Sequence, residues 1–421
     1  MTRQTSKSLW TSTATDTPEW QHLDDNIDVD VVVIGGGFTG VSAAFHLAVG
    51  GASVALLEAH TIGFGGSGRN VGLVNAGLWT PPDEVEQKLG KKAGEKLNSI
   101  LSGGPDIVFG LIEQLQIQCE AERQGTLHCA HSQAGLCDLE KRFAQQQTRK
   151  APVKLLNASE TVSRTGSEAY CGALWDGRAG TIQPLAYVQG LAQAASQLGA
   201  QIFENSSAIS VEEDGSGWRV KTTHGEVKAA RLIQATNAYT TDGAPKNNII
   251  PAYFFQLATA PIPENLLSGI LGAREGCWDT AMIMSSFRLD QAGRMIFGAF
   301  GNLDGLGRQA HATWAMRKLI QLFPQLKNVP FERSWTGRIA MTSSYLPRVE
   351  QRGALGISIF GYSGRGISPG TIFGAAAADW AMGKGELPMD LNPPTHEPNA
   401  AAKSAYYEFG SVMTHLVNAR L

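Results

Sequence analysis

The chain has 421 residues, of which 43% are hydrophobic and 17% charged, and its 35 basic and 38 acidic side chains give a formal net charge of −3. This length exceeds what one compact core usually supports, so two connected domains are expected. The near-neutral charge disfavours non-specific binding of nucleic acids.

The N-terminal segment and the cysteines bear on the compartment. The first 28 residues are polar and lack the apolar core of a secretory signal, which predicts a cytoplasmic protein. Glycines interrupt the most apolar long stretch, so no transmembrane segment is expected, although peripheral membrane association stays open. The five cysteines have no zinc-ligand spacing, and we expect free thiols. His128 and His131, which flank Cys129, are only loosely similar to a metal site, so no metal is expected.

Residues 29–57 have the pattern of a βαβ unit. A β-branched run at 29–34, interrupted only by Asp30, predicts a strand that is buried on both faces of a parallel sheet. The apolar positions of 38–49 follow helical spacing, and a Gly-Gly pair ends that helix before a second strand at 53–57.

The rest of the chain alternates helical and strand-like segments. Residues 81–150 look mainly helical, and 335–380 return to a glycine-rich strand-turn-helix pattern. Between them the predicted elements are a helix at 185–198, strands at 201–209 and 218–222, a turn at 214–217, a strand at 231–235, and β-type segments at 253–260 and 294–300. The last two indicate an antiparallel sheet outside the dinucleotide fold.

The glycine-rich turn after the first strand is typical of a dinucleotide site. Gly35, Gly37 and Gly40 satisfy GxGxxG, and Phe38 and Thr39 lie at the start of the helix. Gly35 permits the tight turn, Gly37 lets the backbone approach a pyrophosphate, and Gly40 allows the helix to pack closely on the strand. The anion would then lie at the positive N-terminus of the helix.

An acidic residue, Glu58, ends the second strand and is followed by Ala59. In this fold such a carboxylate accepts hydrogen bonds from the hydroxyls of the adenosine ribose, and it would repel a 2′-phosphate. The sequence therefore favours FAD or NAD over NADP.

A second glycine-rich loop follows, for which a simple NAD-binding unit has no obvious need. Residues 63–70 read Gly-Phe-Gly-Gly-Ser-Gly-Arg-Asn. Here the sequence resembles the D-amino-acid-oxidase superfamily of FAD enzymes, in the branch that contains gamma-glutamylputrescine oxidase and L-pipecolate oxidase-like enzymes. Four further segments extend the resemblance in family order: Thr-Ile-Gln-Pro at 181–184, Ala-Thr-Asn-Ala-Tyr at 235–239, Trp-Thr-Gly-Arg at 335–338 and Gly-Tyr-Ser-Gly-Arg-Gly at 361–366.

The resemblance implies FAD, with the loop at 63–70 around its flavin end and the segment at 361–366 near the flavin pyrimidine. Relatives that attach FAD covalently use a His beside the early loop or a Cys in the C-terminal half. Neither residue stands at the matching places here, which implies non-covalent FAD. The implied cofactor contacts are Gly35, Gly37, Phe38, Thr39, Gly40, Glu58, Ala59, Gly66, Ser67, Arg69, Asn70, Val71, Ala208, Thr236, Asn237, Gly337, Gly361, Gly364, Arg365, Gly366 and Ile367.

Two arginines and four aromatic residues are candidates for the substrate end. Arg365 and Arg338 would stabilise the reduced flavin or bind a substrate carboxylate through a two-donor fork, the alternative being structural ion pairs. The candidate substrate contacts are Tyr253, Phe255, Trp335 and Tyr362. For the aromatic run at 253–255, core packing is the commoner explanation.

The expected fold is α/β, with a Rossmann-like FAD-binding domain and an interleaved α+β substrate domain that contains an antiparallel sheet. The FAD-binding domain is assigned to 29–80, 152–246 and 333–385, and the substrate domain to 81–151 and 247–332. The sequence analysis leaves an N-terminal extension at 1–28 and a C-terminal tail at 386–421.

The expected reaction is FAD-dependent oxidation of a C–N bond in a small amine or amino acid. A hydride would pass from the α-carbon to the flavin, leaving an imine that water hydrolyses. A gamma-glutamylputrescine-like amine is favoured as substrate, and a cyclic or N-substituted amino acid such as L-pipecolate is the alternative. Oxygen, a quinone or another electron carrier would reoxidise the flavin. Two other functions stay open: a nicotinamide-dependent dehydrogenase, and a flavin-binding subunit without turnover of its own.

Overall fold

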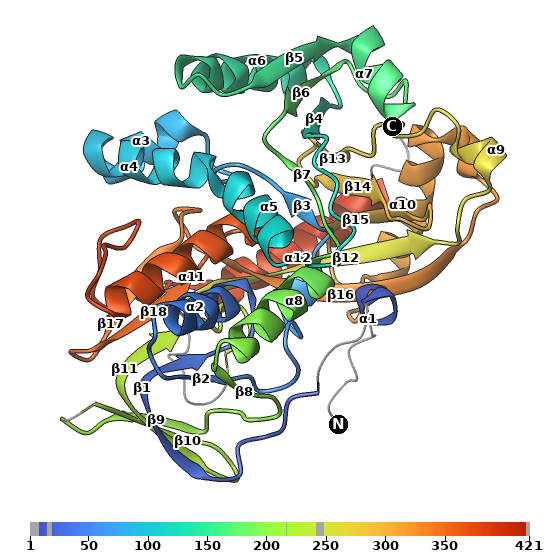
Figure 1. The fold of residues 1–421 in the computed structure, drawn as a ribbon. Coiled ribbons are helices and arrows are strands. Elements are labelled where there is room, and N and C mark those ends of the chain that lie inside the picture. Colours follow the sequence, from blue (N-terminus) through green and yellow to red (C-terminus); the bar gives the residue numbers. More distant parts are fainter. Residues whose placement is uncertain (1–7, 15–18, 216, 241–247, 418–421) are drawn as a thin grey trace.

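The computed structural model describes residues 8–14, 19–215, 217–240 and 248–417. In these ranges the strands form two eight-stranded sheets and a ladder of two short strands, β3 (Leu73–Val74) and β7 (Gly180–Thr181). In Figure 1 most strands of the first sheet lie low in the view, beneath α2 (Phe38–Val49) and α8 (Pro184–Gln197).

The first sheet has a parallel centre. In order its strands are β17 (Arg348–Arg352), β18 (Gly356–Phe360), β11 (Glu226–Gln234), β1 (Asn26–Ile34), β2 (Val54–Leu57) and β8 (Gln201–Phe203), and β10 (Trp218–Lys221) joins β9 (Ser210–Glu213) to β11. Strand β1 pairs in parallel with both β2 and β11. Its residues 31–34 are buried, as expected for a β-branched run covered on both faces.

Helices α2 (Phe38–Val49) and α8 (Pro184–Gln197) contact strands of this sheet, and α11 (Ile367–Ala381) packs on α2. The bounds of α2 confirm the helix predicted at 38–49. Helices α2 and α11 approach closely at Gly374, where an added Cβ would lie 2.3 Å from the carbonyl oxygen of Thr39. The predicted βαβ unit is therefore present, and α11 packs directly on it.

The second sheet is antiparallel except where β13 meets β4. In order its strands are β16 (Phe331–Met341), β12 (Ile250–Thr259), β15 (Met295–Phe300), β14 (Ser285–Leu289), β13 (Gly276–Asp279), β4 (Thr126–Ala130), β6 (Gly172–Asp176) and β5 (Val153–Asn157). Strands β12 and β15 match the β-type segments expected at 253–260 and 294–300.

The two sheets do not divide where the domain boundaries were drawn. Strands β5, β6 and β16 belong to the second sheet, although the sequence analysis grouped them with the FAD-binding segments. Strand β6 pairs with β4 and β5, and β16 pairs along most of its length with β12. These pairings join segments distant in sequence, so local pattern alone does not reveal them.

The predicted helical region contains α3 (Pro82–Leu89), α4 (Lys91–Ser102), α5 (Gly104–Gln114) and α6 (Gln133–Thr148), which confirms its main character. The buried strand β4 interrupts it and was not expected. The strand expected at 201–209 is shorter, because β8 ends at Phe203 and Asn205 adopts a positive φ of 50°. The further helices are α1 (Trp10–Thr13), α7 (Ala158–Thr165), α9 (Glu264–Leu267), α10 (Arg308–Leu322) and α12 (Ala400–Val417).

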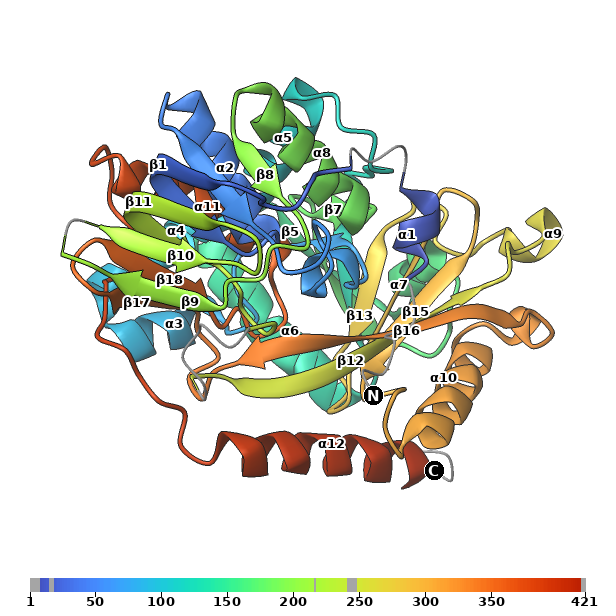
Figure 2. The ribbon, with the colours of Figure 1, turned by 90° about the horizontal axis from the view of Figure 1, so that it is seen from below.

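The described parts of both terminal segments, 8–14, 19–28 and 386–417, pack on the rest of the fold. The indole of Trp10 in α1 is fully buried and donates a hydrogen bond to the carbonyl of Asn70 at 2.9 Å. At the other end, α12 runs along the outside of β12 and reaches α10, as Figure 2 shows. Among the described helices, none combines the length and the apolar composition needed to cross a bilayer. All five cysteines are free thiols.

Candidate active site

A cavity of about 570 Å³ opens at the end of β1 and extends to the second sheet. Its wall is formed by the β1–α2 turn, the end of β2, the loop at 64–71, the turn after β18, and strands of the second sheet. A crevice at the carboxyl ends of parallel strands is the usual ligand position in this kind of fold. Both predicted glycine-rich segments therefore line the same cavity as strands of the antiparallel sheet.

The glycines of the first turn have the structural roles that the motif predicts. Gly35 has a φ of 109°, and an added Cβ would lie 2.7 Å from the carbonyl oxygen of Ala235. At Gly40 an added Cβ would lie 1.9 Å from the carbonyl oxygen of Gly35, so a side chain there would push α2 off the strand. Gly37 is the N-cap of α2 and lines the cavity.

Two helices begin at this cavity. The first residues of α2 line it, and so do residues 367–369 at the start of α11. Helix N-termini carry partial positive charge and favour anionic ligands. The Ser368 hydroxyl is also buried on this wall and has no hydrogen-bond partner among the described residues. The wall therefore offers polar donors to a bound, negatively charged group.

Glu58 is the only acidic side chain among the described residues of the wall. Its carboxylate accepts hydrogen bonds from the backbone N–H of Gly36 at 2.7 Å and of His60 at 2.9 Å. Burial raises the pKa of Glu58, and the hydrogen bonds from Gly36 and His60 oppose that rise. The acid predicted to bind ribose is thus fixed beside the glycine turn.

The second glycine-rich loop is held by side chains of its own. The Asn70 amide donates to the carbonyls of Gly66 and Ser67 at 2.9 and 2.8 Å, and its oxygen accepts from the Gly72 N–H. The Arg69 guanidinium lies 4.4 Å from the centre of the Phe64 ring, and it is off the cavity wall.

Most predicted cofactor residues lie on this one wall. They are Gly35, Gly37, Phe38, Thr39, Glu58, Ala59, Gly66, Ser67, Asn70, Val71, Ala208, Thr236, Asn237, Gly364, Arg365, Gly366 and Ile367. Gly40, Arg69, Gly337 and Gly361 do not line it. Gly337 instead makes room for Phe254, whose ring would be 2.3 Å from an added Cβ, and the Gly361 N–H donates to the Asn237 side chain at 3.0 Å.

The two candidate arginines have different environments. Arg365 is half-buried, and its guanidinium lies 5.6 Å from the ring of Trp79 and 5.3 Å from that of Trp278. It donates a hydrogen bond to the Ala76 carbonyl at 2.9 Å and forms no ion pair within the described chain. Burial, and next the charge of Arg142, lower the pKa of Arg365 to about 10.

Arg338 is exposed at another part of the same wall. Its guanidinium lies 4.5 Å from the ring of Tyr239, whose hydroxyl accepts a hydrogen bond from the Arg338 N–H at 2.8 Å. Arg338 is therefore held near the first-sheet side of the cavity, whereas Arg365 is held near the two tryptophans.

Of the four candidate substrate contacts, only Tyr362 lines the cavity, and its hydroxyl shares a 2.7 Å hydrogen bond with Thr39. Trp335 is buried and donates to the Arg69 carbonyl, and Phe255 packs on His311 in the second core. Tyr253 is also off the wall. Successive side chains of a strand point to opposite faces, which is why Phe254 and not Phe255 reaches the cavity.

A group of side chains at the second-sheet end of the cavity was not predicted from the sequence. They are Trp79, Trp278, Met282, Met284, Phe300, Tyr345 and Tyr407. They come from separate elements and share no motif. His128 packs behind them, with its ring 5.1 Å from that of Trp278, and burial holds its pKa well below the usual value. His131 instead shares a hydrogen bond with Thr280 at 2.8 Å.

A family model described as FAD dependent oxidoreductase, DAO, matches residues 30–380 of the chain. The chain belongs to this family. Its cofactor is therefore FAD, and the nicotinamide-dependent alternative is set aside. The DAO match ends before α12, so the part of the cavity wall that α12 supplies lies outside the matched region.

The chain is similar along most of its length to curated proteins. It is 30% identical to gamma-glutamylputrescine oxidoreductase of Escherichia coli, covering 92% of this chain and 91% of that protein. It is 31% identical to the probable oxidoreductase OrdL of Haemophilus influenzae, covering 85% and 84%.

Solved structures confirm the predicted fold class. Glycine oxidase from Geobacillus kaustophilus superposes with a TM-score of 0.73 at 20% identity, covering 87% of this chain and 98% of that one. L-proline dehydrogenase from P. horikoshii gives a TM-score of 0.71 at 20% identity, covering 88% and 97%.

Proposed function

We propose that this DAO-family enzyme oxidises a C–N bond in a small amine or amino acid that carries a carboxylate, and that Arg365 binds the carboxylate. The observation that supports this most is the environment of Arg365, a half-buried cation on the cavity wall without an ion-pair partner in the described chain.

The wall residues fit FAD along the length of the cavity. The α2 N-terminus with Gly37 would hold the pyrophosphate, Glu58 the ribose hydroxyls, and the start of α11 with Ser368 the flavin pyrimidine. When bound, FAD supplies the electron-accepting chemistry, taking up the hydride that the substrate carbon loses.

Arg365 would gain stability from an anionic ligand. A charge removed from water is usually paired, because an unpaired buried charge is costly. Asp176, the carboxylate whose charge acts on Arg365, already pairs with Arg178 at 2.6 Å. A substrate carboxylate would provide the missing partner through a two-donor contact.

The same wall has a consequence for the substrate amine. Glu58 is the only acid among its described residues, and it belongs to the end assigned to the ribose. No other carboxylate among the described wall residues would stabilise an ammonium group at the reacting carbon, which favours the neutral amine. The neutral amine is the form whose nitrogen lone pair can assist loss of hydride from the adjacent carbon.

Two substrate types match a carboxylate site. A gamma-glutamylputrescine-like amine is favoured, because the E. coli relative with that name is 30% identical over nearly the whole chain. L-Pipecolate is the alternative, and its carboxylate lies directly beside the reacting carbon. In a gamma-glutamylputrescine-like amine the carboxylate is distant from the reacting amine. The two substrate types therefore require different distances between Arg365 and the flavin.

An anaerobic screen tests the proposal. The purified yellow protein is mixed with gamma-glutamylputrescine, putrescine, L-pipecolate, piperidine and glycine, and loss of flavin absorbance is followed. We expect rapid bleaching by a carboxylate-bearing amine and slow bleaching by its counterpart without the carboxylate. Reoxidation of the bleached enzyme by oxygen or by a quinone then identifies the acceptor. Failure of every amine to bleach the flavin would favour a subunit without turnover.

A further inference from the structure

The C-terminal helix α12 supplies part of the cavity wall. Tyr407, in its second turn, lines the cavity beside residues of the second sheet. Its neighbours Phe300, Ile339 and Met341 line the cavity too and pack in the same apolar cluster. The family match ends at residue 380, so this contribution lies beyond the part of the chain that the family model covers.

Tyr407 faces a second tyrosine at the mouth of the cavity. Tyr345, in the turn after β16, lines the cavity and is 39% exposed, and Met282 on the same wall is 87% exposed. These exposed lining residues mark where the cavity meets solvent. The hydroxyls of Tyr345 and Tyr407 lie 3.5 Å apart, and Tyr345 holds a positive φ of 58°.

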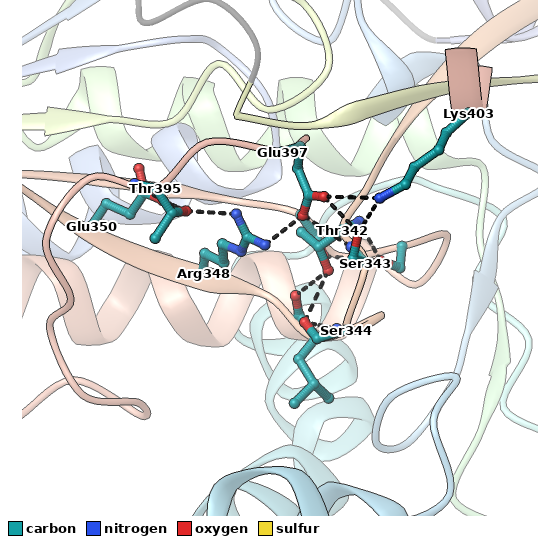
Figure 3. Close-up of polar contacts among 11 residues, drawn as sticks. Thr342, Ser343, Ser344, Arg348, Glu350, Thr395, Glu397 and Lys403 are labelled. Atoms are coloured by element: carbon teal, nitrogen blue, oxygen red, sulfur yellow. Dashed lines mark hydrogen bonds and ion pairs between the residues drawn. The ribbon is translucent and has the colours of Figure 1, made fainter. Parts of the chain in front are cut away.

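A polar network around Glu397, drawn in Figure 3, joins the two segments that carry Tyr345 and Tyr407. Glu397 is 1% exposed and accepts hydrogen bonds from the Ser343 N–H at 2.9 Å and hydroxyl at 2.6 Å. Arg348 pairs with the same carboxylate. Lys403 donates to the Ser343 hydroxyl at 2.8 Å and lies 3.8 Å from Glu397. Ser343 is two residues from Tyr345, and Lys403 is one helical turn before Tyr407.

The remainder of α12 is also fastened. The Asn302 amide donates to Glu408 at 3.3 Å, directly after Tyr407 in the chain. At the end of the helix, the ring of His415 stacks 3.9 Å from that of Trp314 and shares a 2.7 Å hydrogen bond with His311. Because contacts on both sides of Tyr407 hold the helix, its ring has a defined place in the wall.

We propose that Tyr407 and Tyr345 form a size-selecting wall at the mouth of the substrate cavity, and that Glu397 is a positioning residue for this wall. The inference rests on the proposed function for the identity of the bound group, a small carboxylate-bearing amine. The tyrosine rings restrict how far a substrate can extend beyond the carboxylate site, and thereby set which amines fit. Glu397 acts only through the two segments that it joins.

Binding of carboxylate probes tests the wall without turnover. Acetate, benzoate and 2-naphthoate are titrated into the oxidised holoenzyme, and changes in the flavin absorbance give three dissociation constants. Tyr407→Leu removes the ring and should improve binding of 2-naphthoate relative to acetate by roughly tenfold, a gain typical of fitting apolar groups. The matched control is Tyr406→Leu, because Tyr406 lies next along the helix, is 72% exposed and is off the wall.

A second variant protects the test against a folding defect. Tyr407→Trp enlarges the side chain and should weaken 2-naphthoate binding relative to acetate, the opposite direction. If the ratio of the 2-naphthoate and acetate dissociation constants is equal in wild type, Tyr407→Leu and Tyr407→Trp, the proposed wall is wrong. A change of the same size in Tyr406→Leu would overturn it as well, because that ring is off the cavity.

The role of Glu397 is tested by the same ratio. Glu397→Gln removes the charge that Arg348 and Lys403 share, and it should shift the ratio in the direction of Tyr407→Leu. The control is Glu386→Gln, since Glu386 is an exposed acid that pairs with Lys96 at 2.8 Å. Lower thermal stability of Glu397→Gln with an unchanged ratio would show a purely structural role and contradict the assignment.

The wall and the proposed function can fail separately. If no amine bleaches the flavin but the probe ratio changes in the Tyr407 variants, the wall stands and the reaction is wrong. If amines bleach the flavin and the naphthoate-to-acetate ratio is the same in all variants, the proposed reaction stands and the wall is wrong. Absence of probe binding in the wild type and in Tyr407→Leu alike would count against both.

Discussion

The hydroxyl oxygen of Ser67 accepts a hydrogen bond from the first N–H of helix α2, at Phe38, over 3.1 Å. This bond joins the two glycine-rich segments that the sequence places far apart, and it fixes the N-terminus of α2 beside the second loop. An added Cβ on Gly37 would lie 3.0 Å from the same oxygen. The space at the helix start is therefore limited on the side of the loop.

Gly37→Val should largely abolish FAD binding. Gly37 has a φ of −91°, so valine fits the backbone, and the loss would come from crowding at Ser67 and at the pyrophosphate position. The measurement is flavin absorbance per protein after purification, with circular dichroism to establish folding. Gly110→Val is the control, since nothing lies within 4 Å of its added Cβ. Full flavin content in a folded Gly37→Val protein would contradict the pyrophosphate assignment.

Denaturation should release intact FAD. The loop residues Ser67, Gly68 and Arg69 contain no attachment residue, and no cysteine follows Cys277 in the chain. After acid precipitation we expect the yellow colour in the supernatant, with the chromatographic mobility and mass of FAD. Flavin that stays in the protein pellet after washing in denaturant would show a covalent bond.

The buried pair His311 and His415 predicts a loss of stability in mild acid. Burial lowers the pKa of His311 to about 4, and burial together with the charge of His311 lowers that of His415 to about 3. An unfolded histidine titrates near ~6.5. Between these values the unfolded chain binds more protons, so stability falls as pH decreases, by up to about 1.4 kcal/mol per pH unit for each histidine.

Replacement of one histidine tests this pH dependence. His415→Phe keeps a ring for the stack on Trp314 and removes one buried titratable group. Urea unfolding at pH 7 and pH 5 should show a smaller loss of stability in this variant than in wild type. His131→Gln, a change at an exposed histidine, should keep the wild-type difference. If His415→Phe and wild type lose the same stability between pH 7 and pH 5, the His311–His415 pair does not cause the acid sensitivity.

The local elements of the first domain could be predicted because their signals are local. The turn at Gly35 and the bounds of α2 follow from glycine spacing and apolar periodicity within a short segment. The extent of the second sheet could not be predicted, because β16 pairs with β12 and β6 pairs with β4 across long intervening segments. Such non-local pairing depends on tertiary packing and leaves no periodic trace.

The residues of the cavity wall can likewise be divided into those that local sequence motifs predict and those that they do not. The cofactor end was predictable from contiguous motifs, whereas the far end takes Trp79, Trp278 and Tyr407 from three unconnected elements. Phe255 was predicted as a substrate contact but does not line the cavity, because side chains alternate along a strand and Phe254 is the one that lines it. The tail containing Tyr407 gave no motif at all, and only its folding onto β12 brings it to the site.

Substitution of Arg365 separates its two possible roles. If it binds the substrate carboxylate, Arg365→Lys should weaken binding and Arg365→Met should weaken it further, by roughly 1.5–3 kcal/mol for a charged hydrogen bond. Lysine keeps the charge and loses the planar fork, and methionine loses both. The loss should occur only with carboxylate-bearing amines. The measurement is anaerobic flavin reduction by an amino acid and by its decarboxylated amine, for example L-pipecolate and piperidine.

If Arg365 instead stabilises the reduced flavin, both variants should slow reduction by every amine and lower the flavin potential. Arg338→Met is the matched control, because Arg338 lies on the same wall but is exposed and packs on Tyr239. Its effect should be independent of the substrate carboxylate. The packing of Trp79 and Trp278 around Arg365 makes the carboxylate role the expected one, since these rings limit access of water and strengthen a charged contact. Unchanged affinities, rates and flavin potential in both Arg365 variants would leave the arginine with a structural role.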